Sequence, residues 1–203
     1  MRTLMRTKEP APIITDNVVV EHRKTIPEID RYIKHTLPQL KSLNYFVEKV
    51  FDADEAFLLL DEDLPNSLFR SEKESFIKDI VRLCDLFFKR TTTKNIKLRL
   101  EVVNTDMCRF FHADNYRQRL LCTYKGPGTE WLDHSNVKRD GLGKGCNNNI
   151  VKDFSKVNKA STFDVLLLKG TKYEGENAAI VHRSPPILKE AKTRILLKID
   201  ECD

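Results

Sequence analysis

The sequence lacks any apolar run long enough to cross a membrane. Its longest aliphatic runs are residues 18–20 and 165–168, whereas a membrane-spanning helix needs ~20 consecutive apolar residues. The first ten residues carry charge and no apolar stretch follows them, so the pattern of a secretory signal is missing as well. We therefore expect no membrane span and a cytoplasmic location.

The sequence also lacks the cysteine pattern of a disulfide framework. Its 5 cysteines are an odd number, lie far apart along the chain and include no CxxC pair. We expect them to be reduced thiols.

A long block of charge of one sign is missing too. The 35 basic and 30 acidic residues are interspersed along the chain and leave a net charge of +5. A solvated surface of mixed charge accounts for this pattern, which does not favour a nucleic-acid partner.

Helical periodicity dominates the first 95 residues. Between residues 28 and 51 apolar side chains recur at three- and four-residue steps, which predicts one or two helices interrupted near Pro38. Residues 71–90 place a second apolar stripe on one helix face, and Ser71 and Glu74 have the spacing of a capping box. Cys84 lies within this stripe, so we expect its thiol to pack in the core.

After residue 95 the period changes to two. Residues 96–103 alternate apolar and charged side chains, which is typical of a strand with one buried face. Further strands are predicted at residues 107–112, 118–124, 129–132, 164–170, 178–182 and 194–200. Short strands without intervening helices indicate a sandwich or barrel. We expect a single α+β domain in which helices of residues 1–95 pack on a barrel formed by residues 96–203.

Chemistry is indicated where two of these strands end. His112 and Asp114 are two positions apart at the end of the expected strand 107–112, and His182 ends the expected strand 178–182. Two neutral imidazoles and one carboxylate on adjacent strand ends form the facial triad that holds Fe(II) and leaves coordination positions open. Arg194 begins the last strand, where a guanidinium can bind a carboxylate through paired hydrogen bonds. The pattern predicts an iron site on His112, Asp114 and His182 with Arg194 nearby.

The order of these residues resembles the double-stranded β-helix, a jelly-roll or cupin-like barrel, of the Fe(II)- and 2-oxoglutarate-dependent oxygenases. The stretch LLCTYKGPGTEWL is similar to a tyrosine-ended strand and glycine-rich turn of the prolyl-hydroxylase-like members. The resemblance covers residues 96–200. It implies a dioxygenase, most simply a hydroxylase, with Fe(II) on the triad and 2-oxoglutarate held by Arg194 near Tyr124. Its substrate, a small molecule or a protein side chain, has no signature in the sequence.

A second resemblance extends over most of the chain. The segments FHADNYRQRLLCTYKGPGTEWL, LLLKG, HRSPP and RILLKID are similar to a bacterial family of domains of unknown function, family 1826. This resemblance identifies relatives without identifying a reaction.

The triad and its neighbour also have structural interpretations. His112 and His182 fit hydrogen-bonded core histidines, and Asp114 fits a turn cap. Arg194 fits an ion-pair partner of Asp200, which shares its face of the strand.

The carboxylate anchor has alternatives as well. Arg119 and Lys125 flank Tyr124 in the strand, and either is a candidate, whereas Tyr124 itself fits a packing residue. A thiolate of Cys108 would favour zinc. However, on a strand it would lie roughly 13 Å from His112, so we expect it to pack.

Two other classes of function remain open. One is a metal-binding cupin-like protein or metalloenzyme that does not use 2-oxoglutarate. The other is a non-catalytic binding domain with the helices as a partner surface. Metal content separates the second class from both kinds of metalloprotein, and consumption of 2-oxoglutarate separates the oxygenase from the first.

Overall fold

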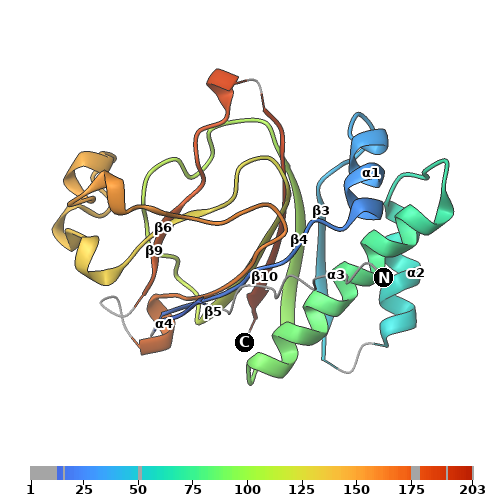
Figure 1. The fold of residues 1–203 in the computed structure, drawn as a ribbon. Helices are drawn as coiled ribbons and strands as arrows, with labels where there is room; N and C mark the ends of the chain where they lie inside the picture. The colour runs from blue at the N-terminus through green and yellow to red at the C-terminus, as the bar shows by residue number, and fades with distance from the viewer. Residues whose placement is uncertain (1–12, 16, 50–51, 175–178, 191, 203) are drawn as a thin grey trace, which may run out of the picture.

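The computed structural model describes residues 13–15, 17–49, 52–174, 179–190 and 192–202. It contains a larger and a smaller antiparallel sheet and a layer of helices (Figure 1). The larger sheet has the strand order β1 (Ile13–Ile14), β2 (Val18–Glu21), β8 (Val165–Lys169), β5 (Gln118–Lys125), β10 (Arg194–Glu201), β4 (Asn95–Val103) and β3 (Leu43–Glu48). The smaller sheet has the order β7 (Asn158–Lys159), β6 (Glu130–Leu132) and β9 (Val181–Arg183).

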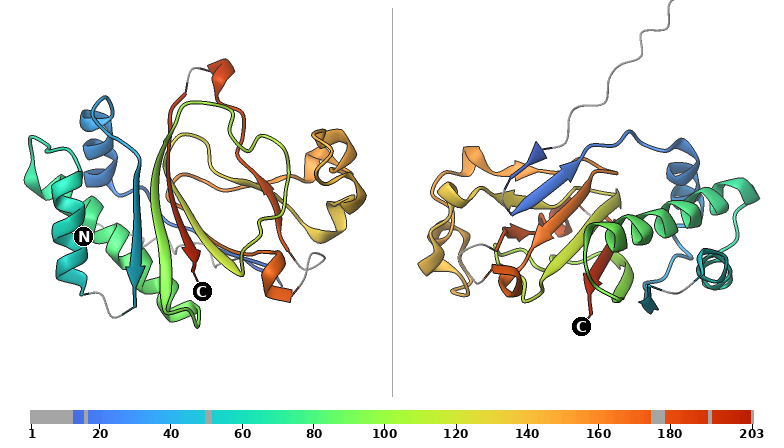
Figure 2. Two further views of the ribbon diagram at one scale, coloured as in Figure 1. Left: turned by 180° about the vertical axis from the view of Figure 1, so that it is seen from behind. Right: turned by 90° about the horizontal axis from the view of Figure 1, so that it is seen from below.

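The helices lie on one side of the larger sheet. They are α1 (Pro27–Thr36), α2 (Ala53–Asp63) and α3 (Arg70–Arg90), whereas the short α4 (Thr171–Glu174) follows directly after β8. Figure 2 shows α3 running along the sheet, with α1 and α2 beyond it. None of the described helices combines the length and the apolar character that a membrane span requires.

The stripe predicted for residues 71–90 forms the contact between α3 and the sheet. Phe76, Ile80 and Phe87 are fully buried, and Cys84 packs against the same core. The predicted helix is therefore confirmed. The predicted capping box is wrong, because the helix begins at Arg70 and its N-cap, Phe69, makes no side-chain cap.

Strand β5 is buried on both faces, because the smaller sheet covers the side that the helices leave free. Leu120 and Tyr124 belong to the core beneath the helices. Leu121 belongs to a second core, which it shares with Trp131 of β6 and Leu196 of β10. Side chains at alternate positions of β5 and β10 therefore point between the sheets.

The helices predicted for residues 28–51 are only partly correct. Helix α1 ends at Thr36, and residues 43–48 form the edge strand β3 instead of a second helix. Exposed and partly buried residues alternate along β3, and Phe46 is 63% exposed. Short apolar runs fit both periods, which explains the error. Residues 50–51 lie outside the described part of the chain.

The strand predicted at residues 107–112 is also wrong. Only His112 pairs there, through an isolated bridge to His182. The other predicted strands correspond to β4, β5, β6, β8, β9 and β10.

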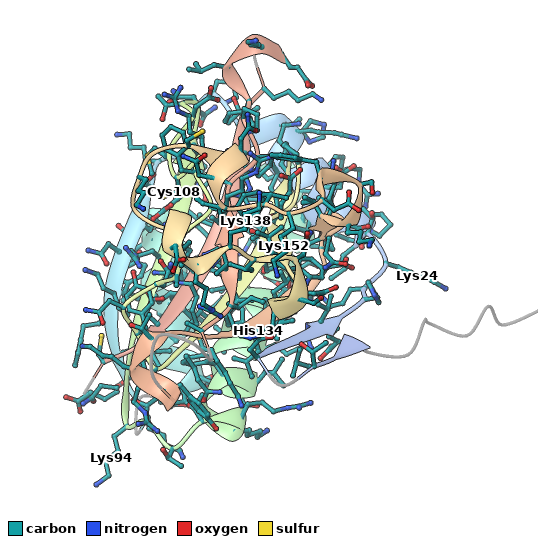
Figure 3. All side chains as sticks on the ribbon, turned by 90° about the vertical axis from the view of Figure 1, so that its left-hand side faces the viewer. Lys24, Lys94, Cys108, His134, Lys138 and Lys152 are labelled. Carbon is teal, nitrogen blue, oxygen red and sulfur yellow. The ribbon has the colours of Figure 1, made fainter. Side chains whose placement is uncertain are left out.

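Between β6 and β8 the chain forms 3-10 turns rather than plain loops. They are η1 (His134–Asn136), η2 (Arg139–Gly141), η3 (Asn147–Asn149) and η4 (Phe154–Lys156), and η5 (Leu188–Glu190) precedes β10. Figure 3, viewed from the side opposite the helices, shows Lys138 and Lys152 on this segment.

Candidate metal centre

Backbone pairing brings the two predicted histidine ligands together. The N–H of His112 donates to the carbonyl oxygen of His182 at 3.0 Å, and the N–H of His182 donates back at 2.9 Å. Residues paired in this way place their side chains on the same side of the sheet. The two imidazole rings consequently lie with their centroids 4.8 Å apart.

Asp114 completes the cluster. One carboxylate oxygen, Oδ1, lies 3.4 Å from Nε2 of His112, and the other, Oδ2, lies 3.1 Å from Nε2 of His182. One ligand atom from each of the three residues lies within 4.8 Å of the others. Two imidazoles and one carboxylate are the donor set that non-haem Fe(II) takes. The structure thus brings together the three residues that the sequence pattern selected.

The hydrogen bonds of the histidines leave their Nε2 atoms facing the carboxylate. Nδ1 of His112 lies 2.8 Å from the carbonyl oxygen of Phe110, which assigns the ring proton to Nδ1 and a lone pair to Nε2. His182 is only 5% exposed, and its buried Nδ1 has no partner among the described residues. A ligand histidine whose outer nitrogen is fixed by a carbonyl is a common arrangement at metal sites.

Charge in the cluster is concentrated on the carboxylate. Burial opposes ionisation of Asp114, but hydrogen bonds with His112 and His182 hold its pKa well below the usual range. Burial lowers the pKa of His182, which favours the neutral ring. Burial also opposes the charged form of His112, but the hydrogen bond to Asp114 raises its pKa. An ionised carboxylate beside a neutral imidazole suits a divalent cation.

Arg119 connects Asp114 to the end of strand β10. Its Nη1 donates to Oδ2 of Asp114 at 2.5 Å, and its Nε donates to Oδ1 of Asp200 at 2.5 Å. The guanidinium also lies over the ring of Tyr116, 4.0 Å from the centroid. Asp200 pairs with Arg99 as well. The carboxylate of Asp114 is thereby held by an ion pair on Oδ2, the oxygen that also approaches His182.

Arg194 lies in a cage of hydroxyl groups. It is 1% exposed, and it donates to Ser184 Oγ at 2.6 Å, Thr123 Oγ1 at 2.9 Å and Thr129 Oγ1 at 2.6 Å. Among the described residues, its buried Nε has no hydrogen-bond partner and its guanidinium forms no ion pair with a carboxylate. Burial lowers the pKa of Arg194 to about 10. The alternative interpretation of Arg194, an ion pair with a carboxylate such as Asp200, is therefore not supported, because Asp200 pairs with Arg99 and Arg119 instead.

A small cavity links Arg194 to the histidines. His112, His182 and Arg194 all contribute to its lining, and its volume is about 30 Å³. This volume accommodates roughly one or two water molecules. Lys198 lines the same cavity, and its Nζ lies 2.6 Å from Oε1 of Glu101. A larger ligand fits only after the lining side chains move.

Tyr124 does not lie at this site. It points to the other face of β5, where its hydroxyl donates to Oδ2 of Asp79 at 2.8 Å. It packs edge-on against Phe76 and Phe163 in the core beneath the helices. The position that the resemblance implied for Tyr124 is therefore corrected to a buried structural one, because strand alternation turns it away from the triad.

Other residues of the site were not anticipated from the sequence. The hydroxyls around Arg194 come from three separate strands or strand ends, so no local motif marks them. Cys108 also lines the cavity, although we expected it to pack in a strand. It is exposed (Figure 3) and has a φ of 53°, so residues 107–111 are not extended there.

Comparison with solved structures finds remote likenesses to oxygenases. The Fe(II)/α-ketoglutarate-dependent dioxygenase TqaL is 15% identical, with a TM-score of 0.44 over 86% of this chain and 74% of that one. A Shewanella oneidensis protein provisionally named an oxygenase is 11% identical, with a TM-score of 0.42 over 91% and 81%. A prolyl-4-hydroxylase from Pseudomonas putida is 9% identical, with a TM-score of 0.34 over 86% and 100%.

No curated protein matches the sequence. The model of the family DUF1826, described as proteins of unknown function, matches residues 12–200. This match covers nearly the whole chain, and the protein therefore belongs to the DUF1826 family.

Proposed function

We propose that this protein is a non-haem Fe(II)- and 2-oxoglutarate-dependent oxygenase, with a hydroxylation as the simplest reaction. One observation carries the proposal. Arg194, a buried arginine with no carboxylate partner among the described residues, lines the same cavity as His112 and His182, the two histidines of the cluster that Asp114 completes. The cluster offers the ligands for Fe(II), and the arginine offers a partner for the distal carboxylate of a dicarboxylate.

The strand order supports a double-stranded β-helix in a single domain. Strands β4, β10, β5 and β8 are neighbours in the larger sheet. Opposite them, the bridge at His112 extends the smaller sheet to the order His112, β9, β6 and β7. Two facing rows of this kind make a jelly-roll barrel. In this proposal, the first 95 residues supply the helices that cover the barrel and three further strands of the larger sheet.

The environment of Arg194 favours an anionic ligand on energetic grounds. Transferring a charge into the protein interior costs several kcal/mol unless a counter-charge compensates it. Three hydroxyl groups compensate only in part, and the lowered pKa of Arg194 reflects the remaining cost. A carboxylate seated here would form charge-assisted hydrogen bonds with the guanidinium.

The residues of the chain have separate tasks in this proposal. His112, Asp114 and His182 would hold the iron, and Arg194 would orient 2-oxoglutarate toward it. Bound Fe(II) would supply the redox chemistry in which 2-oxoglutarate and dioxygen become succinate and carbon dioxide while the second oxygen atom enters the substrate. Arg119 would keep the Asp114 carboxylate ionised and in place.

The small cavity favours a second candidate. At about 30 Å³ it accepts water but not a dicarboxylate without rearrangement. A metal-binding cupin-like protein, or a metalloenzyme without 2-oxoglutarate, needs only the metal and water. In that case Arg194 would be held by its hydroxyl partners for structural reasons.

Elemental analysis of anaerobically purified protein and a succinate-release assay test these possibilities together. We expect about one iron per chain and succinate formed from 2-oxoglutarate in air. Iron without succinate would favour the metal-binding alternative. Protein that binds no metal under any loading condition would favour a non-catalytic binding domain.

A further inference from the structure

The polar groups of the site follow one another in a definite order along strand β10. Arg194 begins the strand, and Asp200 lies six residues later, about 20 Å away at the usual rise. Arg119 pairs with Asp200 and reaches Asp114. The cluster of His112, Asp114 and His182 therefore lies between the Arg194 end and the Asp200 end of the strand. If 2-oxoglutarate occupies the Arg194 end, the Asp200 end is left for the substrate.

A pocket of about 610 Å³ opens at the Asp200 end. We call it the basic pocket. Its charged lining residues are Lys97, Arg99, Arg117, Lys172, Asp200 and Glu201. Its volume lies within the range of small-molecule sites, about 300–1,000 Å³.

The positive charge of the basic pocket is only partly neutralised. Arg99 pairs with Asp200, and Arg117 lies 3.4 Å from Glu201. Lys97 and Lys172 form no ion pair with any described residue. The two lysines therefore leave a net positive charge of two in the pocket lining.

A single side chain, that of Arg119, separates the basic pocket from the cluster of His112, Asp114 and His182. The guanidinium of Arg119 touches Asp114 on one side, and on the other it touches Asp200 and the ring of Tyr116, which both line the pocket. A molecule anchored in the basic pocket would thus lie one side chain away from a metal ligand.

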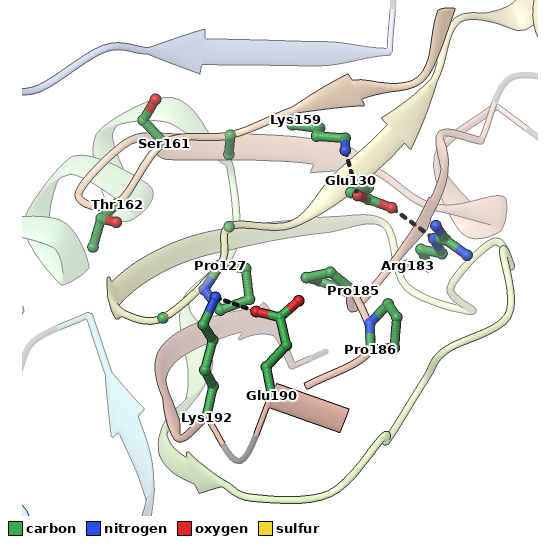
Figure 4. Close-up of a pocket in the computed structure, with 13 residues that line it drawn as sticks. Pro127, Glu130, Lys159, Ser161, Thr162, Arg183, Pro185, Pro186, Glu190 and Lys192 are labelled. Atoms are coloured by element: carbon green, nitrogen blue, oxygen red, sulfur yellow. Dashed lines mark hydrogen bonds and ion pairs between the residues drawn. The ribbon is translucent and has the colours of Figure 1, made fainter. Parts of the chain in front are cut away.

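A second open pocket, of about 560 Å³, provides an internal comparison. Figure 4 shows that its lining, which includes Pro127, Pro185 and Pro186, also carries charged groups. Each of these cations has a carboxylate partner: Lys159 and Arg183 pair with Glu130, and Lys192 pairs with Glu190. We call it the proline-lined pocket. Similar volume without free cations makes it a matched control.

From these contacts we infer that the basic pocket binds the substrate of the proposed reaction and that this substrate is a small organic molecule with a phosphate or carboxylate group. Lys97 and Lys172 hold the anionic group at the pocket rim, and Tyr116 lies on the path toward Asp114. Cationic side chains attract such anions and raise their local concentration. The identity of the pocket as a substrate site rests on the proposed oxygenase function, whereas its affinity for an anion does not.

Calorimetry with phenyl phosphate tests the inference on the metal-free full-length protein. We expect saturable binding to the wild type, weaker binding of benzoate because it carries less charge, and no binding of benzyl alcohol. In the double variant Lys97→Ala/Lys172→Ala the dissociation constant of phenyl phosphate should rise at least about tenfold, which corresponds to ~1.4 kcal/mol. The matched variant Lys159→Ala/Lys192→Ala should bind it as the wild type does. Circular dichroism verifies that both variants are folded.

Several outcomes would overturn the inference. The first is that phenyl phosphate shows no saturable binding to the wild type. The second is that the Lys97/Lys172 variant binds it as tightly as the wild type does. The third is that only the Lys159/Lys192 variant loses affinity for it. Because the protein is free of metal in this experiment, its result is independent of the iron assay. If phenyl phosphate binds in the basic pocket but the protein never consumes 2-oxoglutarate, the anion site stands and the oxygenase proposal is refuted. If succinate is released but phenyl phosphate does not bind, the oxygenase proposal stands and the anion site is refuted.

Discussion

His112 and His182 exchange both of their backbone hydrogen bonds, at 3.0 and 2.9 Å, although neither neighbour of His112 belongs to a strand. This isolated bridge brings the two residues together through backbone groups that neither imidazole ring supplies. The side chains are therefore free to serve as ligands, and their removal need not disturb the pairing.

The first prediction follows from that arrangement. Replacing His112 or His182 with alanine should lower bound Fe(II) at least about tenfold, since losing a ligand costs no less than losing one of its outer hydrogen-bond partners. The backbone bridge needs neither ring, so the fold should survive. Iron content measured beside circular dichroism checks both statements. Unchanged iron in both variants would exclude the cluster as the metal site.

Arg194 allows a test of the carboxylate anchor. The variant Arg194→Met should keep its iron but bind 2-oxoglutarate at least about tenfold more weakly, a loss of ~1.4 kcal/mol or more. Arg194→Lys should recover part of the affinity, because a charge remains but the paired hydrogen bonds do not. Calorimetry on iron-loaded protein measures both. If Arg194→Met binds 2-oxoglutarate normally, Arg119, Lys125 and Lys198 become the next anchors to test.

Arg119 should contribute to stability as well as to metal binding. The variant Arg119→Met removes the ion-pair partner that the partly buried Asp114 shares with the buried Asp200. Removing one partner of a buried ion pair typically costs ~3–5 kcal/mol. We therefore expect a clearly lower free energy of unfolding, measured by urea denaturation, and weaker Fe(II) binding. Arg70→Met, which removes an exposed arginine from two surface ion pairs, is the control and should change neither.

The buried carboxylate of Asp79, on helix α3, should make the stability of the fold depend on pH. Burial opposes its ionisation, but Arg23 and Tyr124 hold its pKa below the ordinary value of 3.8. A group whose pKa is lower in the folded state stabilises the fold above its unfolded pKa, and this contribution disappears as the pH falls through the folded pKa. Asp79→Asn should thus cost about 3 kcal/mol or more near neutral pH.

The difference between wild type and Asp79→Asn should shrink when the pH falls below about 4. Urea denaturation at several pH values measures it. A difference that stays constant down to acid pH would show that the charge of Asp79 is not the source of the stability.

Much of the fold was predictable because its periodic patterns are long. Helix α3 is 21 residues long and carries an apolar stripe from Phe76 to Phe87, roughly three turns, and β5 and β10 are long enough for their buried runs to be distinctive. Strand β3 was not predictable, because its few apolar residues also fit a helix. The loop before His112 resembles a strand in composition, because Phe110 and Phe111 are residues that strands favour.

The candidate site shows the same division. The spacing of His112 and Asp114, together with a distant His182, was visible because the chain has only 5 histidines and two histidines with one carboxylate are a known Fe(II) donor set. The hydroxyl cage of Arg194 and the contacts of Arg119 were not, because they depend on the register of strands that are far apart in sequence. The error for Tyr124 has the same origin, since a position in a motif does not specify which face of a strand it occupies.

Calorimetric titration of 2-oxoglutarate into anaerobic protein, with and without Fe(II), tests the central claim most directly. If 2-oxoglutarate binds both Arg194 and the iron held by the triad, each ligand strengthens the binding of the other, and linkage requires the two factors to be equal. We predict that 2-oxoglutarate binds at least about tenfold more tightly to the iron-loaded wild type than to the metal-free protein, and that His182→Ala abolishes this difference. Iron-loaded wild type that binds no 2-oxoglutarate would contradict the proposed oxygenase.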